Sequence, residues 1–292
     1  MVDNGSRDGS VEKIGHWAMR LGMSFDVVPV GAASPAVATE TTALTLIRVE
    51  RNLGFAGGNN VGLDFLESNL GLTHFLLLNN DACVAQDFFI ELYAAAAKFP
   101  NAGLLTGTIF EVGHQQRVWY AGGRIRPFGT LASHGHRVPL ASEPVVTEFI
   151  SGCAMLISRQ ALDTVGKLAE CYFPAYVEDV EYSFRVGAAG LPIVYAPSAK
   201  VYHKVSSTVR RHCTSAFVAY CMNRHRVFFV RRNLAGWAKL RAFIYLAVSR
   251  PVRMVLEMLS GRPRVAWAVL RGLLAGIAGS TPGGNQSGSS ST

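Results

Sequence analysis

The sequence has no uninterrupted apolar run of the roughly 18 residues that a membrane-spanning helix requires. This holds although hydrophobic residues make up 49% of its 292 positions. It also lacks the basic and then apolar beginning of a secretory signal, because the N-terminus opens with the polar stretch VDNGSRDGS. Neither a spanning helix nor a secretory leader is therefore expected.

Cysteine is scarce and scattered. No Cys-x-x-Cys pair and no zinc-ligand spacing occurs among the five cysteines, which are Cys83, Cys153, Cys171, Cys213 and Cys221. An odd number of dispersed thiols in a chain of this size is typical of a reduced, cytosolic protein. We expect these residues to fill the core.

Two common nucleotide-binding signatures are missing as well. The glycine-rich stretch Arg51–Asn60 reads RNLGFAGGNN. It does not have the GxGxxG spacing of dinucleotide-binding folds, and no Lys-Ser/Thr follows it to form a P-loop. A glycine-rich turn that opens a helix still lets the backbone approach a nucleotide, so we interpret it as part of another kind of nucleotide site.

Acidic residues are almost absent from the C-terminal part of the chain. Residues 1–203 hold 14 Lys and Arg against 19 Asp and Glu, a balance of −5. Residues 204–292 hold 14 basic residues and one acid, Glu257, a balance of +13, and the two parts sum to the net charge of +8. The basic part is expected to face anions, either nucleic acid or an anionic membrane surface.

Aromatic and aliphatic residues surround the arginines of this basic part. Arg224, Arg226, Arg231 and Arg232 stand among Tyr220, Phe228 and Phe229, and two further apolar helices carry interspersed arginines. Such helices suit a membrane interface, whereas aliphatic runs such as FIYLAV match a nucleic-acid surface poorly. We expect an anionic membrane surface and no nucleic acid. The alternative is that these helices pack on the rest of the protein with solvated arginines.

Residues 1–203 alternate strand and helix patterns, which indicates an α/β fold. Strands are expected at FDVVPV, LTLIRV, residues 74–79, LLTGTIF and LPIVYAPSAKVYH, the last broken by Pro197. Helices are expected over 11–22, 57–69 and 86–99, and over a segment with an acidic start that ends at Gly190. The stretch 113–140 is expected to form a loop and hairpin with turns at WYAGGRIRP.

The buried strand at 74–79 carries polar residues only at its end, Asn79-Asn80-Asp81. Open α/β sheets bind ligands at the carboxyl ends of their strands. A single carboxylate there, Asp81, is suited to hold a divalent metal against a diphosphate. The alternative is that Asn80 and Asp81 only form a turn, which these residue types often do.

Five segments taken in order resemble the family-2 glycosyltransferases with the GT-A fold, in particular the rhamnosyltransferase-like branch. They are VDNGSRDGS, RNLGFAGGNNVGL, LLLNNDACV, SGCAMLI with FPAYVEDVEYSFR, and VYHKVSST, and they span residues 2–208. Any one of them is a weak signal, but the set in this order is a strong one. The resemblance implies a GT-A-like mixed sheet flanked by helices.

The resemblance also implies roles for individual residues. It makes Asp179 the catalytic base, with Glu178 beside it as a holder of an acceptor hydroxyl, and it makes Asp81 and His203 the metal site. The nucleotide-sugar would contact Asp3, Asn4 and Asn80, with Asn52, Gly54 and Asn60 as minor contacts. The alternatives are ordinary: acids in a first helical turn stabilise the helix, and a lone histidine at a strand end is usually a surface or core residue.

The chain departs from the family pattern at its start, where the apolar first strand that should precede VDNGS is absent. We expect a GT-A-like domain over 1–205, a helical, membrane-peripheral segment over 206–280 and a disordered tail over 281–292. The implied function is an inverting, Mg²⁺- or Mn²⁺-dependent transfer of rhamnose from dTDP-rhamnose, or of another sugar from a UDP-sugar. The acceptor would be lipid-diphosphate-linked or a polysaccharide, at the inner, cytoplasmic face of the cell membrane. The alternative is a truncated, non-catalytic, membrane-docked partner of a glycan assembly complex.

Overall fold

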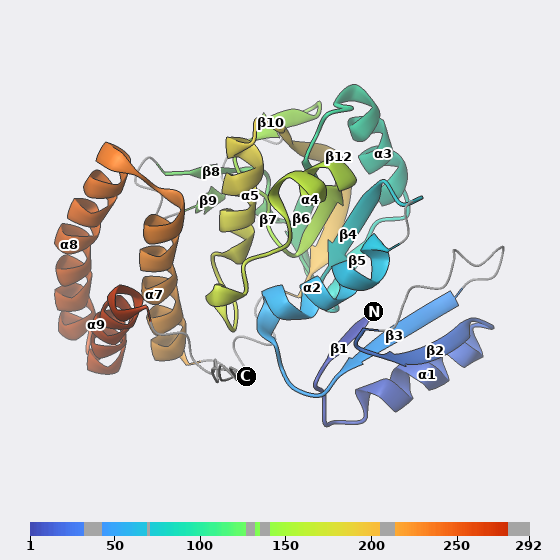
Figure 1. The fold of residues 1–292 in the computed structure, drawn as a ribbon, viewed down its shortest axis with the longest axis horizontal. Helices are drawn as coiled ribbons and strands as arrows, with labels where there is room; N and C mark the ends of the chain where they lie inside the picture. The colour runs from blue at the N-terminus through green and yellow to red at the C-terminus, as the bar shows by residue number, and fades with distance from the viewer. Residues whose placement is uncertain (32–42, 69–70, 127–131, 135–140, 205–213, 280–292) are drawn as a thin grey trace, which may run out of the picture.

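The computed structural model describes residues 1–31, 43–68, 71–126, 132–134, 141–204 and 214–279. Two β-sheets and their flanking helices occupy most of the chain, and three long helices follow (Figure 1). Cys213 and the tail over 281–292 lie outside the described residues. Cys153 and Cys221 are buried, as expected for core residues, whereas Cys83 is exposed.

The first sheet is parallel and has the order β1-β3-β2. Its strands are β1 (Val2–Asn4), β2 (Ser24–Pro29) and β3 (Ala43–Val49), and helix α1 (Ser10–Arg20) packs on β2. Gly15 of α1 faces the ring of Phe25, where an added Cβ would lie 2.8 Å from a ring carbon. The expected strands at FDVVPV and LTLIRV and the expected helix at 11–22 are therefore present, within about two residues at their ends.

The second sheet is mixed and forms the centre of the protein. Its main path runs β10-β12-β6-β11-β4, with β5 paired to β12 and β7 paired to β6. These strands are β4 (His74–Leu78), β5 (Ala82–Val84), β6 (Leu104–Glu111), β7 (His114–Tyr120), β10 (Val145–Thr147), β11 (Ala154–Ser158) and β12 (Ile193–His203). The β6–β12 pair is parallel, whereas the others are antiparallel. A small hairpin, β8 (Gly123–Ile125) with β9 (Ala132–His134), stands apart.

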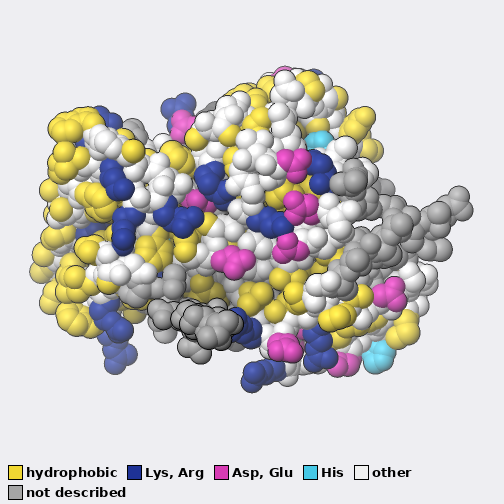
Figure 2. Space-filling model, in the orientation of Figure 1, with side chains coloured by type: hydrophobic (Ala, Val, Ile, Leu, Met, Phe, Trp, Pro, Cys, Tyr) yellow, Lys and Arg dark blue, Asp and Glu magenta, His cyan; other side chains and the backbone are white. Residues whose placement is uncertain are grey.

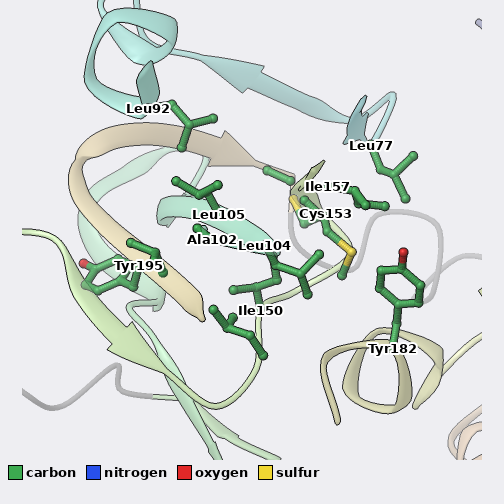
Figure 3. Packing of buried hydrophobic residues seen from close by; sticks show 14 of the residues in the cluster. Leu77, Leu92, Ala102, Leu104, Leu105, Ile150, Cys153, Ile157, Tyr182 and Tyr195 are labelled. Carbon is green, nitrogen blue, oxygen red and sulfur yellow. The ribbon is translucent and has the colours of Figure 1, made fainter. Parts of the chain in front are cut away.

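The main hydrophobic core lies on both faces of this mixed sheet. Leu92 of α3 (Phe88–Lys98) and Tyr182 of α5 (Glu178–Ala188) lie on opposite sides of the β6 residues Leu104 and Leu105 (Figure 3). Helix α4 (Arg159–Val165) and the short 3-10 helix η1 (Glu170–Tyr172) complete this part. All seven residues of β6 before Glu111 are buried, as expected for a central strand covered on both faces.

The two sheets are separate in the described residues. Strand β1 pairs only with β3, and β4 pairs only with β11, so each is an edge strand of its sheet. Helix α2 (Gly54–Glu67) packs against β1 and β4 and so connects the two sheets. Among the described strands, none pairs with both β1 and β4.

Helices α7 (Ser215–Asn233), α8 (Gly236–Leu259) and α9 (Pro263–Ala278) form a helical layer beside the mixed sheet (Figure 1). Helices α7 and α9 approach closely at two glycines of α9. An added Cβ would lie 2.4 Å from the Tyr220 carbonyl oxygen at Gly272 and 2.6 Å from the Val227 Cβ at Gly276. None of the described helices is both long enough and apolar enough to cross a membrane.

Several sequence predictions differ from the structure in detail. The WY of WYAGGRIRP belongs to β7, where Tyr120 is fully buried, and not to a turn. Helix α2 begins at Gly54 rather than at residue 57. Helix α5 is capped at Ala189, one residue before Gly190.

Pro197 does not break the last strand. The strand β12 runs through it, and the pairing with β6 shifts register between Ala196 and Lys200. Proline has no N–H to donate, so a bulge at this position keeps both flanks of the strand paired.

Candidate active site

The Asn79-Asn80-Asp81 motif forms a tight turn at the carboxyl end of β4. The N–H of Ala82 donates to the Asn79 carbonyl oxygen at 3.1 Å, and the chain then returns as β5. Asn80 is exposed at the tip of this turn, while Asp81 is partly buried. The motif therefore lies at a strand end, as the sequence predicted.

The structure brings Asp81 together with His203. Strand β5 pairs with β12 so that Ala82 is opposite His203, and the His203 Nε2 lies 3.1 Å from the Asp81 Oδ1. The N–H of Lys204 also donates to the Asp81 carbonyl oxygen at 3.0 Å. His203 is only 8% exposed, and its Nδ1 has no hydrogen-bond partner among the described residues. The edge of Trp119 packs against the imidazole, with ring centroids 5.4 Å apart.

The Asp81–His203 pair fits a divalent cation that is only partly held by protein. A carboxylate oxygen and an imidazole nitrogen are both accepted ligands for Mn²⁺, and the carboxylate suits Mg²⁺. Within the described ranges, no group of three or more His, Cys, Asp or Glu is placed to hold a metal ion. A cation at this position would therefore need further oxygen ligands, such as those of a diphosphate.

A three-residue segment, Ser151–Cys153, connects the Asp81 turn with Asp179. The Cys153 carbonyl accepts a hydrogen bond from the Asn79 N–H at 2.9 Å. The N–H of the preceding residue, Gly152, donates to the Asp179 Oδ2 at 3.1 Å. Asp179 and the Asp81 turn thus bond to neighbouring peptide units, although 98 residues separate them in the sequence.

Gly152 leaves no room for a larger residue. An added Cβ there would lie 2.7 Å from the ring of Phe55 and 3.5 Å from the Cβ of Asp179. Gly152 belongs to the SGCAMLI segment, one of the segments that carry the family resemblance. The signal in the sequence is its position shortly before a buried strand, where a glycine often marks a close backbone approach.

Glu178 and Asp179 begin helix α5, and burial controls their charge. Burial, and then the charge of Asp179, raise the pKa of Glu178 to about 8. Burial also raises the pKa of Asp179, but the N–H groups of Gly152 and Val180 donate to its carboxylate and oppose the shift. A helix dipole favours the ionised form of acids in the first turn. Desolvation outweighs the dipole at these buried positions.

The two acids therefore differ in chemistry. The carboxylate of Asp179 accepts two backbone hydrogen bonds, which favour its charged form. The Oε2 of Glu178 is buried and has no partner among the described residues. At neutral pH this arrangement favours a proton on Glu178 and a charge on Asp179.

Asp3 and Asn4 end β1, but their side chains have different surroundings. The Asp3 Oδ1 accepts from the Ser6 N–H at 3.2 Å, while its buried Oδ2 has no partner within the described residues. The Asn4 amide is fully engaged with the glycine-rich turn. It donates to the Gly54 carbonyl oxygen at 2.9 Å and accepts from the Leu53 N–H at 2.9 Å. Asp3 is thus available to a ligand, whereas Asn4 holds the turn.

Asn52, Gly54 and Asn60 also have structural partners. The Asn52 Oδ1 accepts from the Gly54 N–H at 2.8 Å. The buried amide of Asn60 bonds to both the N–H and the carbonyl of Leu168, at 3.0 and 2.9 Å. Asn60 therefore ties α2 to the segment before η1, and these contacts occupy its amide.

A hollow of about 540 Å³ lies at the carboxyl ends of β1, β2 and β3. Its lining includes Gly5, Ser6, Arg7, Arg48 and Glu50. None of the site residues expected from the sequence lines it, although Asp3 and Asn4 directly precede Gly5.

Two of the four arginines in the α7 cluster are buried, whereas Arg231 and Arg232 are exposed. Arg224 is fully buried and Arg226 is 8% exposed, and burial together with the charge of Arg250 lowers the pKa of Arg226 to about 10. Arg231 donates to the Gly276 carbonyl oxygen at 2.8 Å near the end of α9. The expectation that this cluster faces lipid or phosphate is wrong for Arg224 and Arg226, because α7 is the inner helix of its layer.

Solved structures share this architecture, which is that of the GT-A glycosyltransferases. A mannosyltransferase from Pyrobaculum calidifontis, solved with GDP-Man and Mn²⁺, is similar with a TM-score of 0.53 over 94% of this chain and 76% of that one, at 14% identity. Residues 1–349 of S. aureus TarS, solved with UDP-GlcNAc, have a TM-score of 0.54 over 94% of this chain and 71% of that one, at 13% identity. These similarities establish the fold.

The chain belongs to the glycosyl transferase family group 2, whose sequence profile matches residues 74–278. It is also similar to the N-acetylglucosaminyl-diphospho-decaprenol L-rhamnosyltransferase of Mycobacterium tuberculosis (strain H37Rv), with 31% identity over 199 residues. That match covers 59% of this chain and 64% of the relative, so the chain spans less than two thirds of the relative's length. The resemblance to family-2 glycosyltransferases and the GT-A fold expected from the sequence are both confirmed.

Proposed function

We propose that this protein is an inverting glycosyltransferase that moves a sugar from a nucleotide diphosphate to a lipid-diphosphate-linked glycan. Rhamnose from dTDP-rhamnose is the proposed donor sugar, with UDP-sugars as the next candidates. One observation carries the proposal: Asp179 and the Asp81 turn bond to adjacent peptide units, Gly152 and Cys153. The reaction needs a base close to the diphosphate site, and both are held here by the segment that precedes β11.

Asp179 acts as the base. Its carboxylate takes the proton of the acceptor hydroxyl while that oxygen attacks the anomeric carbon from the side opposite the diphosphate. The bond between the anomeric carbon and the phosphate oxygen breaks, and the nucleoside diphosphate leaves with the electron pair. Attack from the opposite side inverts the anomeric configuration. Glu178, protonated at neutral pH, donates a hydrogen bond to the acceptor.

Asp81 and His203 would hold a Mg²⁺ or Mn²⁺ ion together with the donor phosphates. Such a cation stabilises the negative charge that develops on the leaving diphosphate. Asp3 fits the nucleobase, because its buried Oδ2 needs a donor and the N–H of a pyrimidine base supplies one. Asn80, exposed at the turn, is proposed to contact the phosphates. Asn4, Asn52, Gly54 and Asn60 are proposed to shape the nucleotide site through the contacts that hold the glycine-rich turn and α2.

The acceptor places the reaction at a membrane, and helices α8 and α9 are proposed to dock there, on the inner face of the cell membrane. Exposed apolar residues follow one side of α8 at helical spacing: Trp237, Leu240, Ile244, Val248, Val252, Val255 and Leu259. On α9 the exposed Trp267 and Leu274 alternate with exposed Arg264 and Arg271. Figure 2 shows hydrophobic side chains over α8 with Lys and Arg nearby. An apolar stripe with flanking arginines matches an anionic bilayer.

In this proposal, residues 1–205 are the catalytic unit and residues 206–280 are the membrane-peripheral segment.

The test is turnover. The full chain is incubated with Mn²⁺, a panel of dTDP-, UDP- and GDP-sugars, and a synthetic polyprenyl-diphosphate N-acetylglucosamine acceptor, and the glycolipid product is measured. We expect transfer from one donor, with an anomeric configuration opposite to that of the donor by NMR. Retention of configuration would contradict the inverting mechanism.

A second candidate is a non-catalytic, membrane-docked partner of a glycan assembly complex. The separation of β1 from β4 favours it, because among the described residues no backbone pairing holds Asp3 against the Asp81 turn. Absence of turnover with every donor, together with intact vesicle binding, would select this candidate over the enzyme.

A further inference from the structure

The segment from Phe173 to Val177 leads directly into the acids of α5. Tyr176 and Val177 have φ angles of +82° and +79°, in the left-handed region that non-glycine residues rarely occupy. Two such residues in succession persist only where the surrounding structure fixes them, and they often occur next to active sites. The contacts of this segment therefore determine where Glu178 and Asp179 lie.

Helix α7 holds this segment through two adjacent side chains. The Arg224 Nη2 donates to the Phe173 carbonyl oxygen, and the His225 Nδ1 lies 2.9 Å from the Tyr176 carbonyl oxygen. The same Arg224 Nη2 lies 2.7 Å from the His225 Nε2. Both side chains are fully buried.

These contacts define the form of the imidazole. The carbonyl of Tyr176 only accepts, so Nδ1 carries the proton, and the guanidinium only donates, so Nε2 is the acceptor. This is neutral histidine with a proton on Nδ1. Burial and the charge of Arg224 lower the pKa of His225 to about 4, which agrees with this form. Arg224 therefore donates a hydrogen bond to His225, and His225 donates one to the Tyr176 carbonyl oxygen.

A third contact comes from the glycine-rich turn. The Phe55 N–H donates to the Pro174 carbonyl oxygen at 2.7 Å, and an added Cβ at Gly54 would lie 2.6 Å from that oxygen. The segment is thus bound from the nucleotide side by α2 and from the helical layer by α7. It connects both parts of the protein to the start of α5.

We propose that Arg224 and His225 are positioning residues, which fix the 173–177 segment and through it the catalytic acids of α5. This inference rests on the proposed function only in naming those acids catalytic. It links the helical layer, which carries the proposed membrane face, to the position of the base. A change in the seating of α7 would then alter the rate of transfer.

The test compares His225→Leu, which removes both bonds, with His225→Asn, which keeps an N–H donor close to the Nδ1 position. Val227→Ala is the control, because Val227 is buried on the same helix but packs against α8 and α9. We expect His225→Leu to lower kcat by about ten- to a hundredfold, with the donor KM within about twofold of the wild-type value. His225→Asn should recover much of the lost rate, and Val227→Ala should leave kcat unchanged.

Amide hydrogen exchange tests the same contact without any activity. The amides of 176–181 should exchange faster in His225→Leu than in wild type or Val227→Ala, and His225→Asn should reduce the difference. If wild type transfers no sugar, the proposed function fails while this readout still decides the positioning role. Equal exchange in all four proteins, or an unchanged kcat in His225→Leu, would overturn the inference. If His225→Leu does not fold, Arg224→Lys, which keeps the charge but loses the fork of donors, replaces it with the same expectations.

Discussion

The backbone N–H of Gly152 donates to the carboxylate of Asp179 at 3.1 Å. This bond fixes the proposed base next to the start of strand β11. The carbonyl of Cys153, the residue before β11, accepts a hydrogen bond from the Asp81 turn. The distance between base and diphosphate site therefore depends on a single glycine-containing segment. Its close packing against Phe55 also ties the site to the glycine-rich turn.

Gly152→Ala should damage catalysis more than folding. The new Cβ meets the Phe55 ring, and the displaced backbone would carry the N–H away from Asp179, so we expect a loss of about ten- to a hundredfold in kcat. Overpacking of this kind also costs about 1–3 kcal/mol of stability. The control is Gly187→Ala on the exposed side of α5, where the nearest atom is 3.8 Å away. It should gain up to about 1 kcal/mol. Equal activity in the two variants would contradict the role of Gly152.

Asp179→Asn should abolish transfer and preserve donor binding. The amide fills the same space but does not accept a proton, so we expect kcat to fall by about 10²–10⁴-fold. Donor affinity measured by calorimetry with Mn²⁺ should stay within about twofold. Normal turnover by this variant would remove Asp179 from its assigned role.

Asp81→Ala and His203→Ala should weaken metal-dependent donor binding. Loss of either ligand leaves one protein contact for the cation, and we expect at least about a tenfold rise in the donor Kd in the presence of Mn²⁺. With EDTA, the variants and wild type should bind the donor alike. Asp87→Ala, an exposed aspartate six residues further on, is the control. A Kd in Asp81→Ala that responds to Mn²⁺ as in wild type would exclude the metal role.

The pH dependence of stability should report on Glu178. The pKa of Glu178 in the folded protein, about 8, lies above the ordinary glutamate pKa of 4.5. Between these two pKa values the folded state binds one more proton at Glu178 than the unfolded state does. The stability that this proton contributes is therefore lost as the pH rises from about 4.5 through about 8. Glu178→Gln should flatten this decline in Tm by several degrees relative to wild type, whereas Glu12→Gln, at an exposed position of α1, should not change it. A wild-type Tm that does not fall over this range would contradict the buried, protonated form.

The same shifts predict the acid limb of the rate profile. Burial raises the pKa of Asp179 above the ordinary aspartate value. Transfer needs the ionised form, so kcat should fall at a higher pH than it would for a solvent-exposed aspartate. The measurement is kcat against pH at saturating donor and acceptor. An acid limb at the ordinary aspartate pKa would show that Asp179 is solvated in the working enzyme.

Glutamates on the exposed face of α8 should release the protein from membranes. The variant combines Ile244→Glu, Val248→Glu and Val252→Glu, and Ile90→Glu on α3 is a matched exposed control. Wild type and Ile90→Glu should float with vesicles that contain phosphatidylglycerol, and should bind less as salt is raised. The triple variant should remain at the bottom of the gradient. Equal flotation of all three proteins would contradict the proposed membrane face.

Much of the fold could be predicted from the sequence because its signals are local. Period-2 and buried strand patterns, helix caps and the glycine-rich turn placed most elements of residues 1–111 within a few residues. The family resemblance implied that Asp81 and His203 form one metal site, and the structure brings these two side chains together. For residues 113–140 the sequence predicted a loop and hairpin without strand limits, because the β7 residues follow no clear period; the structure pairs β7 with β6.

The electrostatics of the site could not be predicted in the same way. Acids at a helix start, such as Glu178 and Asp179, are ordinarily stabilised in their ionised form by the dipole. Their burial depends on packing from elements far away in the sequence. The same applies to Arg224 and Arg226. Arginine is usually exposed, but these two residues are buried because α7 is the inner helix of its layer.

The sequence by itself determined which residue types stand at strand ends and helix starts, and hence the family and the chemistry on offer. Only the tertiary structure decided which of them meet: Gly152 with Asp179, and His225 with Tyr176. The physical reason is that periodicity and turn propensity act over a few residues, whereas desolvation and long-range hydrogen bonds depend on what the folded chain brings to each position.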